Sequence, residues 1–154
     1  MIKIVTIIGA RPQFIKASML SRLFLAQDNF KEILVHTGQH YDQNMSHIFF
    51  EELSIPLPNY NLNIHEETPA KQIASMIIEH EKVIRTENPN FILVYGDTNS
   101  TIAGALTGIK MDLPVIHIEA GLRSFDKSMP EEINRIITDH CSSLHFCPSQ
   151  TAVE

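Results

Sequence analysis

Short apolar segments recur along the chain and predict the strands of a sheet. Four of them are nearly continuous runs of Ile, Val, Leu and Phe instead of alternating patterns, which is typical of strands covered by helices on both faces. These runs are residues 3–8, 33–37, 91–95 and 115–118. A weaker fifth run spans residues 144–147, and a short strand is possible only near residues 60–62.

Helical spacing of apolar residues fills the intervals between the predicted strands. We expect helices over residues 14–27, 69–88, 99–111 and 131–141, the second opening with Thr68 as N-cap and Pro69 at the first position. The first helix is expected to place on one face Ile15, Met19, Leu20, Leu23 and Phe24. The last is expected to turn Ile133, Ile136 and Ile137 inward. Strands alternating with helices predict an α/β fold with a doubly wound, mostly parallel sheet and helices on both faces.

Composition narrows the class of protein. The 154 residues are 44% hydrophobic with a net charge of -6, enough for one domain over 1–154 and without a basic block that would predict nucleic-acid binding. No apolar run approaches the ~20 residues of a membrane span, and no signal peptide is apparent, so we expect a soluble, cytoplasmic protein. Cys141 and Cys147 lack metal-ligand spacing. Residues 149–154 look like the opening of a helix, so we expect further chain beyond them.

Ligands of a doubly wound sheet bind beyond the carboxyl ends of its strands, so the residues after each strand are the candidate site. The first strand is followed by Gly9 and Arg11, and then by a helix carrying Lys16. A helix N-terminus with two cations suits a phosphate or diphosphate, while an ordinary turn with a surface ion pair explains the segment equally well. The segment is neither a G-x-G-x-x-G motif nor a P-loop.

Two further loops carry polar side chains. After the second strand, Gln39 and His40 could hydrogen-bond a sugar or a base, although an ordinary loop explains them better when taken alone. After the run at 91–95, Asp97 is placed to face the cleft, and the alternative is that Asp97 or Asn99 caps the following helix.

The last two loops add carboxylates. Glu119 ends an apolar strand, and Glu131 begins a helix that also carries Asn134 and Arg135. An acidic helix start explains one glutamate as ordinary capping. His117 and Glu119 match the H-x-E of zinc deaminases, but their P-C-x-x-C partner is absent, so we expect no metal. Three carboxylates beside two cations suit proton removal next to an anionic leaving group.

Five segments together resemble the signature blocks of the UDP-N-acetylglucosamine 2-epimerase family, in the same order and at similar spacing. They are Gly9-Ala10-Arg11-Pro12-Gln13 with Lys16, Thr37-Gly38-Gln39-His40, Gly96-Asp97-Thr98-Asn99-Ser100-Thr101, His117-Ile118-Glu119-Ala120-Gly121-Leu122-Arg123 and Pro130-Glu131-Glu132-Ile133-Asn134-Arg135. The resemblance covers the whole chain and implies one Rossmann-like half of a two-domain, glycosyltransferase-B-like fold. It also implies that the C-terminal, UDP-binding domain is absent from this chain.

The chemistry implied by the resemblance is that of the non-hydrolysing branch: elimination of UDP to 2-acetamidoglucal, then re-addition with the proton delivered to the opposite face of C2. The matching catalytic residues are Asp97, Glu119 and Glu131. The matching substrate-binding residues are Arg11, Lys16, Gln39, His40, Arg123, Asn134 and Arg135. The partner is UDP-N-acetylglucosamine or a related UDP-sugar, no cofactor is implied, and we expect a homodimer in the full-length form.

Departures from the family pattern leave alternatives open. Asp42 and Thr68 stand where some bacterial members carry a glutamine and an arginine of an activator site, so the resemblance does not imply activation by substrate. A diacetamido sugar nucleotide as substrate, the hydrolysing branch, and a glycosyltransferase-like sugar-nucleotide-binding domain are the alternatives.

Overall fold

A six-stranded parallel sheet forms the centre of the protein. The computed structural model describes residues 1–39, 50–52 and 56–153, and within them the strand order is β3-β2-β1-β4-β5-β6. The strands are β1 (Ile2–Ile8), β2 (Phe30–His36), β3 (Tyr60–Asn61), β4 (Phe91–Tyr95), β5 (Val115–Ile118) and β6 (Leu144–Phe146). Every neighbouring pair is parallel. The expected doubly wound α/β fold is confirmed.

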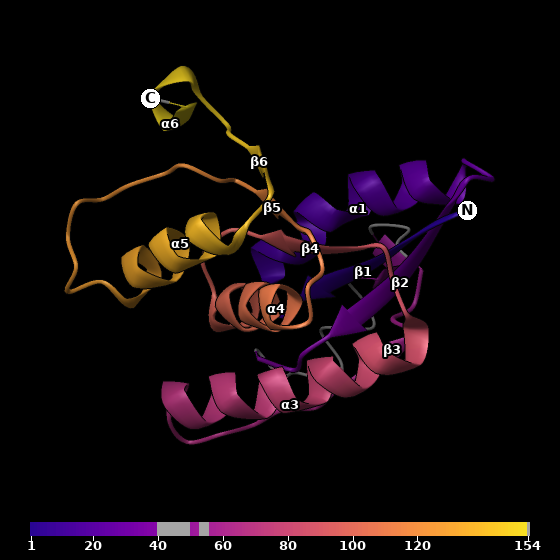
Figure 1. Ribbon diagram of the computed structural model, residues 1–154, viewed down its shortest axis with the longest axis horizontal. Helices are drawn as coiled ribbons and strands as arrows, with labels where there is room; N and C mark the ends of the chain where they lie inside the picture. The colour runs from indigo at the N-terminus through magenta and orange to yellow at the C-terminus, as the bar shows by residue number, and fades with distance from the viewer. Residues whose placement is uncertain (40–49, 53–55, 154) are drawn as a thin grey trace.

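Helices cover both faces of the sheet. They are α1 (Arg11–Leu25), α3 (Pro69–Glu87), α4 (Asn99–Lys110), α5 (Pro130–Cys141) and the short α6 (Gln150–Val153). Figure 1 shows α1 on one side of the sheet and α3, α4 and α5 on the other, with α6 set apart at the C-terminal end. Each face has its own apolar core, one around Phe14, Leu34 and Leu93 and the other around Ile7, Val35 and Val94.

The order of the strands fixes where a ligand could bind. From β1 the chain goes outward to β2 and β3, returns to β4 on the other side of β1, and continues to β5. The loops after β1 and β4 therefore diverge to opposite faces, which opens a crevice at the carboxyl ends of these strands. The loop after β5 lies at the same edge, because Tyr95 of β4 is in register with Ile118 of β5.

The buried face of α1 differs from the expectation. Ile15, Met19 and Leu23 are 50%, 66% and 58% exposed, so the apolar face expected for this helix is not the face that the helix buries. The buried residues of α1 are Gln13, Phe14, Ala17, Ser18 and Ser21. The helix also begins at Arg11 instead of residue 14, because Pro12 is accommodated in the first turn, where a backbone N–H is not required.

α5 departs from the expectation in the same way. Ile133 is 38% exposed, whereas the buried residues of the helix are Glu132, Asn134 and Thr138. The inward orientation predicted for Ile133 was therefore wrong, and polar side chains of α5 point into the protein where its first turns approach the site.

Threonines cap two of the helices. Thr68 accepts a hydrogen bond from the N–H of Lys71 at 3.3 Å, as the sequence predicts for the start of α3. At α4 the cap is Thr98, which exchanges hydrogen bonds with Thr101 in a capping box. The alternative in which Asp97 or Asn99 serves as the cap was wrong, so the carboxylate of Asp97 is free for another role.

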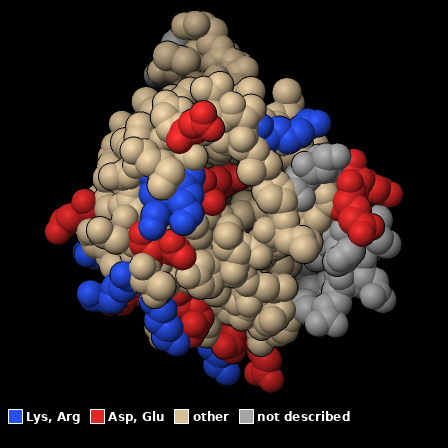
Figure 2. Space-filling model, turned by 90° about the vertical axis from the view of Figure 1, so that its right-hand side faces the viewer, with Lys and Arg blue, Asp and Glu red and all other residues tan. Residues whose placement is uncertain are grey.

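The surface on the side where the N-terminus lies mixes charges of both signs. Figure 2 shows lysines and arginines there next to aspartates and glutamates, without a broad basic area on that face. The ammonium of Lys3 forms an ion pair with the carboxylate of Glu87 at 3.3 Å. Among the residues that the structure describes, no helix has the length and apolar character needed to cross a bilayer.

Candidate functional site

Gln13 joins the turn after β1 to the turn after β4. Its side-chain oxygen accepts hydrogen bonds from the N–H groups of Gly9 and Ala10, at 2.8 and 2.9 Å. Its side-chain nitrogen donates to the carbonyl of Tyr95 at 2.7 Å and to the hydroxyl of Thr101 at 3.0 Å. Gln13 is 2% exposed, and its side chain joins the two edges of the crevice by direct hydrogen bonds. The sequence shows the residue but not this role, which depends on contacts across the sheet.

Gly9 is required by close packing. A Cβ atom at this position would lie 2.2 Å from the hydroxyl of Ser100 and 2.3 Å from that of Thr37. Those two hydroxyls share a hydrogen bond of 2.8 Å beneath the turn. The glycine therefore lets the turn after β1 approach the start of α4.

Asp97 follows β4 and is held by α5. Its Oδ2 accepts from Nε and Nη2 of Arg135 at 3.1 and 2.8 Å, and its backbone carbonyl accepts from the amide of Asn134 at 2.9 Å. The side chain remains 33% exposed. Arg135 thus covers one carboxylate oxygen and leaves the group accessible at the end of the strand.

Glu119 follows β5 and has an unusual backbone. Its φ is 69°, a left-handed conformation that costs about 1–2 kcal/mol for a residue with a side chain. Its N–H donates to the carbonyl of Phe146 at 3.0 Å, and its Oε2 forms an ion pair with the ammonium of Lys16 from α1. Strained non-glycine residues tend to occur at functional sites, so this backbone conformation favours a functional role for Glu119.

The carboxylates of Asp97 and Glu119 lie at neighbouring strand ends. The residue between them in space is Gly96, whose added Cβ would come within 3.3 Å of Oε2 of Glu119. Gly96 has a φ of 64° and its N–H donates to the carbonyl of Ile118 at 2.9 Å. The structure therefore brings two of the three predicted catalytic carboxylates to one edge, each paired with one cation.

Glu131 and Glu132 have different surroundings in the first turn of α5. Glu131 is exposed at the helix start, one turn before Asn134 and Arg135. Glu132 is 1% exposed and is the better connected of the two, a residue for which the sequence suggests no role. Its carboxylate accepts from the N–H groups of Ser124 and Phe125 at 2.9 and 3.0 Å, and from Nη1 of Arg135 at 2.5 Å.

The electrostatics of this group favour charged forms. The backbone hydrogen bond from Ser124 lowers the pKa of Glu132, although desolvation acts against it. Desolvation acts to lower the pKa of Arg135, but the hydrogen bonds and charges of Asp97 and Glu132 outweigh it and raise the pKa. One guanidinium therefore bridges two carboxylates, and its planar fork fixes their relative orientation.

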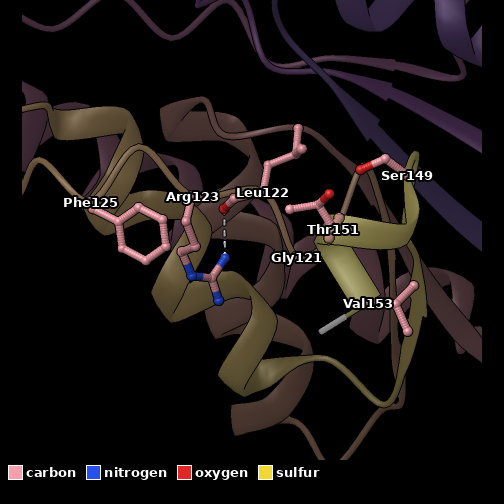
Figure 3. A pocket seen from close by; sticks show the side chains of 8 residues that line it. Gly121, Leu122, Arg123, Phe125, Ser149, Thr151 and Val153 are labelled. Atoms are coloured by element: carbon pink, nitrogen blue, oxygen red, sulfur yellow. Dashed lines mark hydrogen bonds between the residues drawn. The ribbon is translucent and has the colours of Figure 1, made fainter.

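Arg123 lies beside a cavity at the ends of β5 and β6. Its Nη1 donates to Oδ2 of Asp139 at 2.6 Å and to the carbonyl of Leu122 at 2.7 Å. The cavity has a volume of about 540 Å³, and its lining includes Arg123 and Phe125 on one side and residues of α6 on the other. Figure 3 shows the Arg123 side chain next to the ring of Phe125, with Thr151 and Val153 across from them. Asp97, Glu119 and Glu131 do not line this cavity.

The remaining predicted binding residues are distributed around the same edge. Gln39 accepts hydrogen bonds from the N–H and the hydroxyl of Ser100, at 3.0 and 2.6 Å, so its side-chain oxygen faces the start of α4. Arg11 is exposed at the start of α1. His40 and Asp42 lie outside the described residues. No group of three or more metal-ligating side chains occurs within residues 1–39, 50–52 and 56–153.

Comparison with known proteins identifies the family. The family profile for UDP-N-acetylglucosamine 2-epimerase matches residues 24–154. The chain belongs to this epimerase family. A relative from Pseudomonas aeruginosa, a UDP-2,3-diacetamido-2,3-dideoxy-D-glucuronate 2-epimerase, is 58% identical over 152 residues. A UDP-N-acetylglucosamine 2-epimerase from Methanocaldococcus jannaschii is 51% identical over 150 residues.

The epimerase family also accounts for the fold. The crystal structure of the M. jannaschii UDP-GlcNAc 2-epimerase in complex with UDP-GlcNAc and UDP superimposes with a TM-score of 0.93 at 50% sequence identity, covering 99% of this chain and 42% of that one. The Pseudomonas and M. jannaschii relatives are likewise matched over 99% and 97% of this chain but only 43% and 41% of their own length. The chain thus spans less than half the length of these epimerases.

Proposed function

We propose that this chain supplies the acid–base half of a non-hydrolysing UDP-N-acetylglucosamine 2-epimerase. The observation that supports it most directly is the pair Asp97 and Glu119, which end adjacent strands and are each bound through one carboxylate oxygen by one cation. Inversion at C2 requires a group that removes a proton on one face of the sugar and a group that returns it on the other. Two positioned carboxylates at one edge meet that requirement.

In the first half of the proposed reaction, a carboxylate removes the proton from C2 and the bond from C1 to the UDP oxygen breaks. The electron pair of the C–H bond forms the C1–C2 double bond of 2-acetamidoglucal, and UDP leaves as an anion. In the second half, the UDP oxygen attacks C1 while C2 takes a proton from the opposite face. The product is UDP-N-acetylmannosamine, and neither an oxidant nor a metal is required.

The cations have a defined part in this scheme. Lys16 has three donors on its ammonium, so it can hold Glu119 and still donate to a departing diphosphate. Arg11, at the N-terminus of α1, is the second cation proposed for the diphosphate, and the positive end of the helix dipole there favours an anion as well. The roles of Glu131, Gln39, His40, Arg123, Asn134 and Arg135 in catalysis or substrate binding remain part of the proposal.

The rest of the active site would come from a second domain. Because the chain spans 43% and 41% of two epimerase relatives, we place the UDP-binding wall of the cleft outside these 154 residues. One wall leaves the carboxylates exposed to water, where charges interact weakly with a departing diphosphate. We therefore expect activity, and the proposed homodimer, only in the full-length protein.

A diacetamido sugar nucleotide is the second candidate substrate. The observation in its favour is the 58% identity to the Pseudomonas enzyme that carries this substrate in its name, against 51% to the M. jannaschii UDP-N-acetylglucosamine enzyme. Both substrates would undergo the same chemistry at C2. They differ at C3, the ring carbon bonded to C2, and at C6, which is remote from the reacting atom.

Incubation of the full-length protein with each sugar nucleotide in heavy water tests the proposal. We expect deuterium at C2 of a product that is still linked to UDP. Free N-acetylmannosamine with UDP would instead show the hydrolysing branch. A sugar transferred without label at C2 would show a glycosyltransferase and refute the epimerase proposal.

A further inference from the structure

His117 is enclosed in the middle of β5 beneath the candidate site. It is 0% exposed and lies on the face of the sheet that α5 covers. Its Nδ1 lies 2.7 Å from Oδ1 of Asp139, and its Nε2 lies 2.7 Å from the backbone carbonyl oxygen of Gly96. Both distances are those of strong hydrogen bonds.

Both partners of the imidazole ring are acceptors. A backbone carbonyl has no proton to donate. Asp139 is held as a carboxylate, because its Oδ2 accepts from Arg123 at 2.6 Å and from the N–H of Gly121 at 3.1 Å. Burial acts to raise the pKa of Asp139, but the hydrogen bonds from His117 and Arg123 outweigh it and lower the pKa to about 2. A neutral imidazole has one N–H, so one of its nitrogens would face an oxygen lone pair at 2.7 Å.

We propose that His117 carries a proton on both ring nitrogens and that this buried imidazolium is a positioning residue for Asp97. The charge follows from the two acceptors alone. The positioning role rests on the proposed epimerase function, because it concerns the carboxylate that the reaction would use.

The geometry of the turn explains how the ring acts on Asp97. Gly96 is in the left-handed region, and β5 holds both of its backbone groups: Ile118 accepts from its N–H at 2.9 Å and His117 donates to its carbonyl. Asn134 then holds the carbonyl of Asp97. The peptide between Gly96 and Asp97 is therefore fixed on the Gly96 side by a charge-assisted bond, which is stronger than a neutral one.

A cation at this position is compensated by its surroundings. The ionisable groups around the ring are Asp139 on α5, Arg123 after β5, and His145, which is in register with His117 on β6. Beyond the Gly96 peptide lie Asp97 and Glu119. Asp97 and Glu119 are already paired with the cations Arg135 and Lys16. Asp139 is therefore the direct counter-ion of the imidazolium, shared with Arg123, and it lowers the cost of burying the ring as a cation.

Nuclear magnetic resonance tests the charge without any assay of activity. In the full-length protein with ¹⁵N-labelled histidine, His117 is assigned by its loss in His117→Gln, and its ring nitrogens are observed at about pH 8, where an ordinary histidine has lost its second proton. We expect both nitrogens to carry hydrogen and to have imidazolium shifts. A single protonated nitrogen would overturn the proposal, whether or not the protein is an epimerase.

Steady-state kinetics test the positioning role. We expect His117→Gln and Asp139→Asn to lower kcat about tenfold to a hundredfold, with KM changed less than about threefold, because the substrate still binds while Asp97 is misplaced. The matched control is His145→Gln, the neighbouring ring on the same face, whose Nε2 contacts only the backbone carbonyl of Asp139 among the described residues. Unchanged kcat in His117→Gln, or equal losses in the control, would overturn the role. An inactive wild-type protein whose His117 is an imidazolium would refute the proposed function and leave the charge assignment intact.

Discussion

The burial of His80 should make the stability of the protein depend on pH. The side chain is 1% exposed within α3, and no described residue forms a hydrogen bond of ordinary geometry with either ring nitrogen. Burial lowers the pKa of His80 from 6.5 to about 4, and the carbonyl of Ala103 offsets this only in part. The folded protein therefore holds this ring neutral under conditions in which the unfolded chain binds a proton.

The size of the effect follows from linkage. A histidine with a depressed pKa contributes its full stability above the unfolded value of 6.5 and loses it as the pH falls toward about 4. At about pH 4.5 the unfolded ring is almost fully protonated and the folded ring mostly neutral, which costs roughly 2.5 kcal/mol relative to pH 7. A loss of this size is a large share of the ~5–15 kcal/mol that stabilises a typical domain.

Urea unfolding of the wild type and of His80→Leu at about pH 7 and pH 4.5 measures the contribution of His80 to the free energy of unfolding at each pH. Between the two pH values, we expect the free energy of unfolding to fall by roughly 2.5 kcal/mol more in the wild type than in the variant, because leucine does not bind a proton. The control is Met76→Leu, one turn earlier on α3 and fully buried, which changes packing without a titrating group. Equal losses in the wild type and His80→Leu would show that the buried ring does not carry the predicted penalty.

Three further predictions concern the site. In the full-length protein, Asp97→Asn and Glu131→Gln should each lower kcat by about 10²–10⁴ with little change in KM, and near-normal turnover would remove that residue from the mechanism. Glu132→Gln should raise the rate of amide hydrogen exchange at Phe125, measured by NMR, because a neutral amide accepts more weakly from that N–H. Gly96→Ala should lower the free energy of unfolding by about 1–2 kcal/mol in urea, since its φ of 64° is left-handed; an unchanged stability would contradict the strain.

Much of the fold could be predicted because parallel strands covered on both faces need apolar side chains in both directions. For this reason the sequence contains continuous apolar runs at β1, β4 and β5, and the observed strands coincide with those runs. The boundaries were less predictable. β2 begins at Phe30 instead of residue 33, because its first residues lie near the rim of the sheet and alternate between exposed and half-buried.

The site could be predicted only as a set of loops. Strand ends place Asp97 and Glu119 at one edge, since parallel strands share their direction. The residues that bind the loops together, Gln13, Glu132 and Asp139, could not be assigned from the sequence. Each has a partner in another loop or strand, 82, 8 and 22 positions away in the chain respectively. A polar residue on a helix has the same pattern whether it faces water or such a partner.

These polar contacts with the loops also explain why the apolar spacing did not indicate the buried faces of two helices. A helix normally buries its apolar stripe, and on that basis Ile133 of α5 was expected inside. Met19, on the apolar face of α1, is likewise exposed. At the ends of these helices, however, the turns after β1, β4 and β5 present backbone groups that need partners, and an unsatisfied buried group costs roughly 1–3 kcal/mol. Gln13 on α1 and Glu132 on α5 each satisfy two such N–H groups, so the polar face turns inward at the site and the apolar side chains are displaced to the surface. Where a helix packs against loops instead of a strand, polar periodicity is therefore the better guide to its buried face.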